Sequence, residues 1–314
     1  MDKFGNIDGA VFSPRLAAIF RPRDEHSVRV SFNRAFRSPS TTNNYLDIAL
    51  VNPVDLRALG IPNPFPLVVR AVGSELPIGS TPQETLKEES MTAYEVAYTG
   101  TIRSQTTLGV AFYVNDMNDS INFVTLPRNR DPYTPANPPP GWPLPPAVLG
   151  LLGQTGVFLP RTGFTYLNLG PTRQRGLELS LDHRFSSGFS TFANYSWQGD
   201  PEIIDDPNPF PLVELSLPPT NRFNAGGTYN GPRFLGSLSV NYTDGAFWSD
   251  VLTPVFHGFT ESFTLTNGSF GVKWLGGRTT TLIKINNLFN ETVQQHVFGD
   301  LFRRSVVGEV RFDF

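Results

Sequence analysis

The sequence has 314 residues, with 25 Lys and Arg against 28 Asp and Glu, which gives a formal net charge of −3. This balance excludes the basic surface that nucleic-acid binding requires, so we expect no nucleic-acid partner. The chain contains no cysteine, which excludes disulfide bonds, thiol catalysis and cysteine metal sites. No apolar run reaches the roughly 18–20 residues of a membrane helix, and residues 1–6 lack the apolar segment of a secretory signal.

Segments that alternate between apolar and polar residues run through the chain. They predict β-strands with one apolar and one polar face. The first begins near Leu16, and from Val28 to Phe32 the apolar residues alternate with Arg29 and Ser31. Later segments with this period are residues 94–98, 108–114, 177–181, 191–197, 238–242, 270–274 and 305–314. The pattern predicts an all-β chain of about eleven strands.

The connections between these strands alternate between short and long. Short turns are expected near residues 22–25, 102–105, 185–188, 230–233 and 275–278. Long loops are expected over residues 37–87, 126–163, 199–220, 243–263 and 288–302. Bacterial outer-membrane barrels have short periplasmic turns and long extracellular loops, whereas a soluble sandwich has no reason to place every long loop at one end. The pattern therefore favours a transmembrane antiparallel β-barrel.

Four blocks of sequence resemble, in the same order, blocks of the TonB-dependent receptors. They contain Arg-Ala-Phe-Arg-Ser-Pro after the strand near Val28, Leu-Lys-Glu-Glu-Ser before Tyr94, Arg-Gly-Leu-Glu-Leu before Ser180, and Ile-Asn-Asn-Leu-Phe-Asn before Glu291. The last block continues to the terminal Phe314, which resembles the signal that the barrel-assembly machinery reads. The blocks cover nearly the whole chain.

The resemblance implies a barrel of about 22 strands, an N-terminal plug domain and a periplasmic box that contacts TonB. It implies import of ferric siderophores, cobalamin, haem or oligosaccharides across the outer membrane of a Gram-negative bacterium. We expect residues 1–314 to be the C-terminal part of such a barrel, with about 11–12 strands. We expect the plug domain and the signal peptide to be absent from it, so that TonB would be contacted only through a missing N-terminal region. Outer-membrane lipid, the assembly machinery and an unknown small-molecule cargo are the expected partners.

The predicted site residues fall into two groups. On the polar strand faces, which would line the lumen, charged residues of both signs are expected to pair with one another. They are Arg29, Glu95, Glu178, Lys284, Glu309 and Arg311. In the proline-rich loop 127–160, three aromatic residues, Tyr133, Trp142 and Phe158, are candidates for cargo binding.

Enzymatic and metal sites receive no support from the sequence. The histidines, His26, His183, His257 and His296, have no metal-ligand spacing, and no HExxH or GxSxG motif occurs. We expect no catalytic residue, no cofactor and no metal. An acidic loop with Asp200, Asp205 and Asp206 leaves calcium binding as an open alternative. Two alternatives to a receptor also remain open, namely an outer-membrane barrel hydrolase and a soluble β-sandwich binding module.

Overall fold

The computed structural model describes residues 11–205, 217–248 and 257–313. Strands dominate this part of the chain, and the helical segments are short. They are α1 (Thr41–Tyr45), α2 (Ala147–Gln154) and the 3-10 turns η1 (Arg57–Leu59) and η4 (Leu275–Gly277). No helix among the described residues has the length and apolar character needed to cross a membrane.

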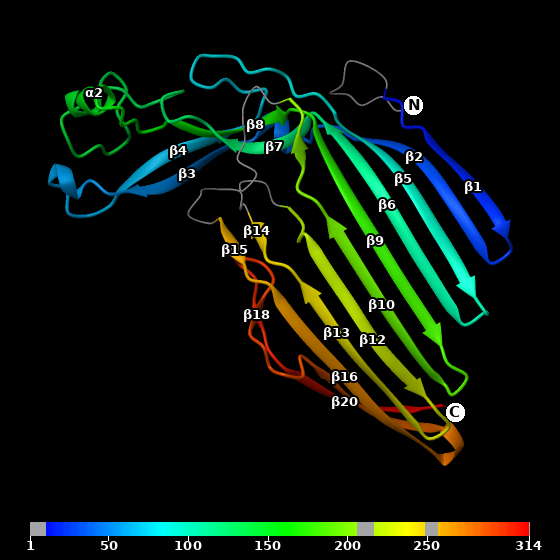
Figure 1. Ribbon diagram of the computed structural model, residues 1–314. Helices are drawn as coiled ribbons and strands as arrows, with labels where there is room; N and C mark the ends of the chain where they lie inside the picture. The colour runs from blue at the N-terminus through cyan, green and yellow to red at the C-terminus, as the bar shows by residue number, and fades with distance from the viewer. Residues whose placement is uncertain (1–10, 206–216, 249–256, 314) are drawn as a thin grey trace.

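Most strands join one long antiparallel sheet, in which they follow one another in chain order (Figure 1). In sheet order they are β1 (Arg15–Arg23), β2 (His26–Arg37), β5 (Glu89–Ile102), β6 (Thr106–Asn118), β9 (Thr172–Arg184), β10 (Phe189–Gln198), β12 (Asn221–Asn230), β13 (Phe234–Thr243), β16 (Phe263–Trp274), β17 (Thr279–Asn286) and β20 (Ser305–Phe312). The short β11 (Glu202–Ile203) pairs with β9 outside this path. These eleven strands confirm the predicted all-β architecture.

Pairing across the sheet keeps apolar and polar residues in separate rows. Leu179 of β9 lies opposite Val110 of β6 and Tyr195 of β10. Its neighbour Glu178 lies opposite Ser196. Because successive residues of a strand point to opposite faces, the sheet has one apolar face and one polar face.

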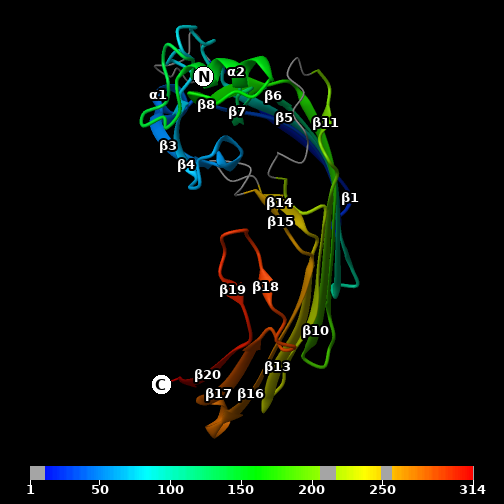
Figure 2. The same ribbon diagram turned by 90° about the vertical axis from the view of Figure 1, so that its left-hand side faces the viewer.

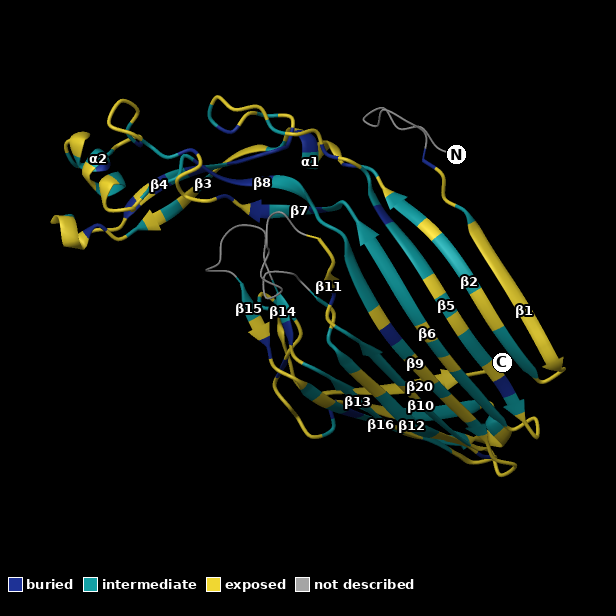
Figure 3. Ribbon diagram, turned by 45° about the horizontal axis from the view of Figure 1, so that its top comes forward, coloured by how far each residue is buried: buried dark blue, intermediate teal, exposed yellow. Residues whose placement is uncertain are grey.

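The apolar face is not covered by protein. Leu238 of β13 is 55% exposed and Phe270 of β16 is 57% exposed. Of the buried hydrophobic side chains in the described residues, none lies in the eleven strands, and Figure 3 shows these strands mainly in the intermediate and exposed classes. An apolar surface of this extent requires a non-aqueous neighbour. It is the surface expected of a barrel wall in lipid, and a single sheet layer (Figure 2) is not a sandwich.

The expected alternation of short and long connections is confirmed. Tight turns follow β1, β5, β9, β12 and β16 and lie together at one end of the sheet, while the long connections lie at the other end (Figure 1). All the short turns therefore lie at one end of the sheet, as in outer-membrane barrels.

The long connections were expected to be loops, but several of them contain strands, and two of them fold together. They fold into a four-stranded sheet of order β3-β4-β8-β7. Its elements are β3 (Asp47–Val54), β4 (Phe65–Val72), β7 (Ser120–Thr125) and β8 (Thr162–Leu169), with η1 and α2 beside them. We call residues 47–72 and 120–169 the loop subdomain. It projects to one side of the long sheet (Figure 2).

The loop subdomain contains the main hydrophobic core of the described residues. Val69 of β4 is 1% exposed and packs in one cluster with Leu67, Leu149 of α2 and Phe164 of β8. The subdomain is tied to the segment just before β5 by Asn168 of β8, whose side-chain oxygen accepts a hydrogen bond of 2.8 Å from the Lys87 amide. The core thus stabilises the loops, while the long sheet relies on its strand pairing.

Two short hairpins form where the last long connections leave the sheet. They are β14–β15 (Ala246–Trp248 with Gly258–Thr260) and β18–β19 (Val293–Gln294 with Leu301–Phe302). The rings of Trp248 and His296 meet with centroids 4.5 Å apart, so these two connections pack on each other.

Gly73 sits where the chain leaves β4 and passes α1. A Cβ atom at Gly73 would lie 2.4 Å from the backbone carbonyl atoms of Asn44, and the Gly73 amide already donates a hydrogen bond of 2.7 Å to the Leu46 carbonyl. Because backbone atoms cannot rotate away, we expect Gly73→Ala to destabilise the loop subdomain by about 1–3 kcal/mol. Hydrogen exchange of the β4 amides measures this loss.

The matched control is Gly150→Ala in α2. There a Cβ would meet only the Pro135 side chain, at an ordinary 3.4 Å. Because alanine favours a helix over glycine, this change should stabilise the subdomain by up to about 1 kcal/mol. Equal losses at Gly73 and Gly150 would contradict the backbone-contact argument.

Candidate functional site

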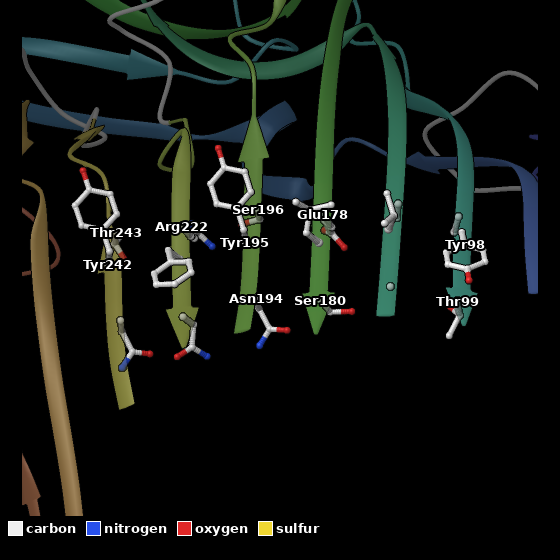
Figure 4. Close-up of a pocket in the computed structure, with 18 of the residues that line it drawn as sticks. Tyr98, Thr99, Glu178, Ser180, Asn194, Tyr195, Ser196, Arg222, Tyr242 and Thr243 are labelled. Carbon is white, nitrogen blue, oxygen red and sulfur yellow. The ribbon is translucent and has the colours of Figure 1, made fainter. Parts of the chain in front are cut away.

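A groove of about 530 Å³ crosses the polar face of the long sheet. It draws side chains from seven strands, β2, β5, β6, β9, β10, β12 and β13, and Figure 4 shows ten of its residues labelled. No single segment of sequence builds it, because the strand register brings these positions together. Because it gathers polar and charged side chains from seven strands, we take this groove as the candidate site.

The strand register places the groove residues in two transverse rows. The first row runs from Glu178 through Ser196 to Arg222, each directly opposite the next. The second row consists of amides and hydroxyls. It runs from Thr99 through Gly109, Ser180, Asn194 and Asn224 to Asn241. Three adjacent asparagines therefore form a ladder of side-chain amides across β10, β12 and β13.

The first row carries two charges that make no ion pair within the described part of the chain. These are the Glu178 carboxylate and the Arg222 guanidinium, which are two strands apart on either side of Ser196. Neighbouring strands are spaced by about 4.8 Å, so the two backbone positions are roughly 10 Å apart. That separation leaves both charges open to a third group between them. Arg29, at the far end of the groove, is instead paired with Glu95.

The groove provides binding groups but no nucleophile with a base. Each asparagine amide offers two donors and one acceptor oxygen, and the free carboxylate and guanidinium add one charge of each sign. Such a surface suits a polar partner with hydroxyl, amide or carboxylate groups. No histidine lines the groove, so the geometry favours recognition over acid–base chemistry.

The charged residues that the sequence assigned to the lumen lie on the polar face. Lys284 of β17 and Glu309 of β20 are joined by an ion pair of 2.5 Å between adjacent strands. Arg311 pairs with Asp313 at 3.0 Å, at the end of β20. With the pair of Arg29 and Glu95, only Glu178 of the six predicted charges has no ion pair in the described residues. A purely structural role for this set remains a prediction.

Arg222 was not singled out in the sequence. Residues 221–230 form β12, but Gly226 and Gly227 interrupt the apolar alternation there, and the strand gave no clear local signal. The asparagine ladder was also not predicted, because it depends on the register between three strands. A strand assigned at 221–230 would have placed Arg222 and Asn224 on the polar face.

The three aromatic candidates for cargo binding have different surroundings in the loop subdomain. Tyr133 packs against the hydrophobic core and its hydroxyl donates a hydrogen bond of 2.8 Å to the Val68 carbonyl. Trp142 packs edge-on against Phe65 with ring centroids 5.3 Å apart. Phe158 lines a cavity at the edge of the core. Of the three, Phe158 is therefore the residue whose surroundings include a cavity.

The histidines described in the long sheet contact hydroxyl groups. His26 Nδ1 lies 2.8 Å from the Tyr98 hydroxyl, and His183 Nδ1 lies 2.7 Å from the Thr106 hydroxyl. Among the described residues, no group of three or more His, Asp or Glu side chains is arranged to hold a metal ion. Asp206 and Phe314 lie outside the described residues.

Comparison with known proteins places these features in context. The family model described as TonB dependent receptor-like, beta-barrel matches residues 2–288. No curated protein matches the chain.

The fold is similar to that of several solved structures. The siderophore receptor PirA from Acinetobacter baumannii gives a TM-score of 0.62 at 14% identity, covering 99% of this chain and 42% of that chain. A mutant of the ferric enterobactin receptor PfeA from Pseudomonas aeruginosa gives 0.61 at 13% identity, covering 95% and 39%. The FrpB iron transporter from Neisseria meningitidis gives 0.58 at 15% identity, covering 95% and 38%. The chain therefore spans about two fifths of the length of these structures, and the likeness is one of fold.

Proposed function

The chain belongs to the TonB-dependent receptor β-barrel family, and from that premise we propose that it forms part of an outer-membrane receptor that imports a scarce nutrient. The family and its solved neighbours are receptors and transporters rather than enzymes. The observation that carries the proposal is the long sheet, which has an uncovered apolar face for lipid and a polar groove on the opposite face. Its long connections, with the loop subdomain, would face outward to meet cargo.

We propose that the sheet is completed by a further β segment. β1 and β20 each have a neighbour on one side only among the described strands, and every adjacent pair on the path is antiparallel. Because the path has eleven strands, β1 and β20 run in the same direction. A second copy inserted with the same orientation would then meet both edges in parallel, against the antiparallel rule of these barrels. The completing segment should therefore contribute an odd number of strands.

The cargo class is a narrower proposal. The solved neighbours are named for a siderophore, for ferric enterobactin and for iron, so ferric siderophores come first, ahead of cobalamin, haem and oligosaccharides. We assign cargo contact to Phe158 among the three aromatic candidates, because Tyr133 and Trp142 already pack on the core. The free Glu178 and Arg222 of the groove would meet cargo or a plug.

The partners follow from the same assignment. Outer-membrane lipid would contact the apolar face, and the barrel-assembly machinery would insert the chain. Contact with TonB would be made by a segment outside this chain. The natural location is the outer membrane of a Gram-negative cell.

The test is uptake of labelled cargo by iron-starved cells of the encoding organism, with and without the coding region of this chain. Loss of the region should reduce uptake of an iron-55 siderophore complex to the level left by a protonophore, and a plasmid copy should restore it. Cobalamin, haem and a labelled oligosaccharide are assayed in parallel to identify the class. Unchanged uptake of all four would overturn the proposal.

A further inference from the structure

A second cavity, of about 470 Å³, lies in the loop subdomain. Its walls include Leu67 and Val69 of β4, Phe164 of β8, and Phe158 and Leu159 from the segment after α2. Several of these side chains also form the core cluster. The volume falls in the range of about 300–1,000 Å³ that small-molecule sites occupy, and the lining is mainly apolar, as in such sites.

The cavity lies at the end of the loop subdomain where β4 and β8 are not paired. They pair in parallel from Arg70 and Thr162 onward, and before these residues the described strands show no pairing between β4 and β8. At Gly163 the strands are in close contact, since a Cβ there would lie 2.5 Å from the Val69 Cγ1 atom. Phe158 and Leu159, which precede β8, line the cavity together with Leu67 and Val69, which precede the paired part of β4. The cavity is thus built into a folded core and is not a gap between loose loops.

Once the ion pairs among the described residues of the loop subdomain are taken into account, an unpaired arginine remains at this cavity. Its three carboxylates are each paired with an arginine, in the pairs Asp47–Arg70, Asp55–Arg57 and Asp131–Arg161. The sequence of the two segments contains two further arginines, Arg128 and Arg130, and no further Asp or Glu. Neither arginine has an ion pair among the described residues, and Arg128 lines the cavity.

Two neutral polar groups accompany Arg128. Asn52 of β3 and Thr125 at the end of β7 line the same cavity, and their side chains make no hydrogen bond within the described chain. In an apolar pocket a few polar groups at the wall fix the orientation of a ligand. Here they comprise one guanidinium, one amide and one hydroxyl, so donors outnumber acceptors.

We propose that this cavity binds a small anionic amphiphile. Its aromatic or branched aliphatic body would pack against Leu67, Phe158 and Phe164, and its carboxylate or similar acidic group would accept hydrogen bonds from Arg128. The inference rests on the proposed function for the outward position of the loop subdomain, and the cavity includes Phe158, to which cargo contact is assigned above. The pocket and its charge are independent of transport.

The test uses the full chain folded in detergent micelles and two probes of equal shape. Naphthoate carries the acid, and naphthalene methanol is its neutral counterpart. Equilibrium dialysis measures binding. A parallel dialysis with protein-free micelles measures how much probe partitions into detergent, and this amount is subtracted. Because a hydrogen bond to a charged group is lost, Arg128→Gln should weaken naphthoate binding roughly tenfold or more. Binding of naphthalene methanol should stay the same.

The matched control is Arg130→Gln, which removes the same charge two residues away from a side chain that does not line the cavity. It should leave naphthoate binding unchanged. A second variant, Thr125→Trp, fills the cavity from its margin and should abolish binding of both probes. Thr155→Trp, at a residue that does not line the cavity, should not. All variants are compared at matching far-ultraviolet circular dichroism.

Two results would overturn the inference. One is the absence of saturable naphthoate binding to the wild-type chain, and the other is an equal loss from Arg128→Gln and Arg130→Gln. If naphthoate binding fails these tests but siderophore uptake depends on the coding region as proposed, the binding pocket is overturned and the receptor function is retained. If the micelle experiment gives the predicted binding but deletion of the coding region leaves uptake of all four cargo classes unchanged, the receptor function is overturned and the pocket is retained.

Discussion

Replacing Leu238 with arginine is expected to cost about 2–4 kcal/mol of unfolding free energy in a lipid bilayer. Leu238 lies in the middle of β13, is 55% exposed and pairs with Gly227 and Gly268 on either side. These small neighbours offer no protein surface to shield a guanidinium, so the charge would enter the hydrocarbon. Denaturant titration of the chain folded in vesicles measures the change.

The adjacent residue provides the control. Ser239 is on the opposite, polar face of the same strand, opposite Gly226 and Asn267. Arginine at this position should reach water, so Ser239→Arg is expected to cost less than about 1 kcal/mol. Equal costs at the two positions would mean that the two faces do not differ in their contact with lipid.

A second large loss of stability is expected in the loop subdomain when Asp131 is replaced with alanine. The Asp131 side chain is 8% exposed, pairs with Arg161 at 2.7 Å and accepts a hydrogen bond of 2.6 Å from the Thr162 hydroxyl. Removing one partner of a buried pair leaves the other charge uncompensated, at about 3–5 kcal/mol. Because the Arg161 side chain is 36% exposed, water offsets part of this, and we expect about 2–4 kcal/mol.

Hydrogen exchange of β4 and β8 measures the effect, since the Arg70 amide donates to the Arg161 carbonyl beside the pair. Protection at neutral pH should fall roughly 30-fold or more. Asp55→Ala is the matched control, because the pair of Asp55 with Arg57 is largely exposed, at 58% and 74%. Its loss should cost less than about 1 kcal/mol. Similar losses from both would contradict the importance of burial.

The same carboxylate predicts a pH dependence. Burial acts to raise the pKa of Asp131, but hydrogen bonds from Arg161 and Thr162 and the charges of Arg161 and Arg70 outweigh it and hold the pKa below its usual value. Such a group stabilises the fold at pH above the unfolded-state pKa of about 3.9, and the contribution is lost as pH falls through the lowered pKa. Protection of β4 should therefore decrease below about pH 4, and Asp131→Asn should flatten this decrease.

The long sheet could be predicted from the sequence because its signals are local. Antiparallel neighbours joined by tight turns follow each other in the chain, and the period of two reports which face each residue occupies. Leu177, Leu179 and Leu181 form such a pattern, and the register places them in apolar rows. The turn positions were also correct, because the strands on either side limit where the turns can lie.

The loop subdomain could not be predicted in this way. Its parallel pairing joins β4 to β8, whose residues are separated by the whole of β5, β6 and β7. Prolines such as Pro53 and Pro66 lie within its strands and read locally as loop. For this reason the sequence predicts Tyr133 and Trp142 as candidates for cargo binding, whereas in the structure both pack against the core. Only the register and the core together show which aromatic side chain borders the cavity.

The candidate groove was predicted in part. Its charges on β2 and β9, Arg29 and Glu178, are visible from alternation alone. The asparagine ladder and the open position between Glu178 and Arg222 depend on which residues lie opposite each other across β9, β10 and β12. Register between strands is therefore the information that the sequence pattern lacked.

The most direct test of the central claim, that one face of the sheet meets lipid and the other meets water, is a spin-label scan along β9. The chain has no cysteine, so single cysteines at successive positions from Leu177 to Asp182 can be labelled without removing native ones. In vesicles, labels at Leu177, Leu179 and Leu181 should be reached by oxygen and those at Glu178, Ser180 and Asp182 by a water-soluble nickel complex. Accessibility to the nickel complex at all six positions, without alternation, would contradict the account.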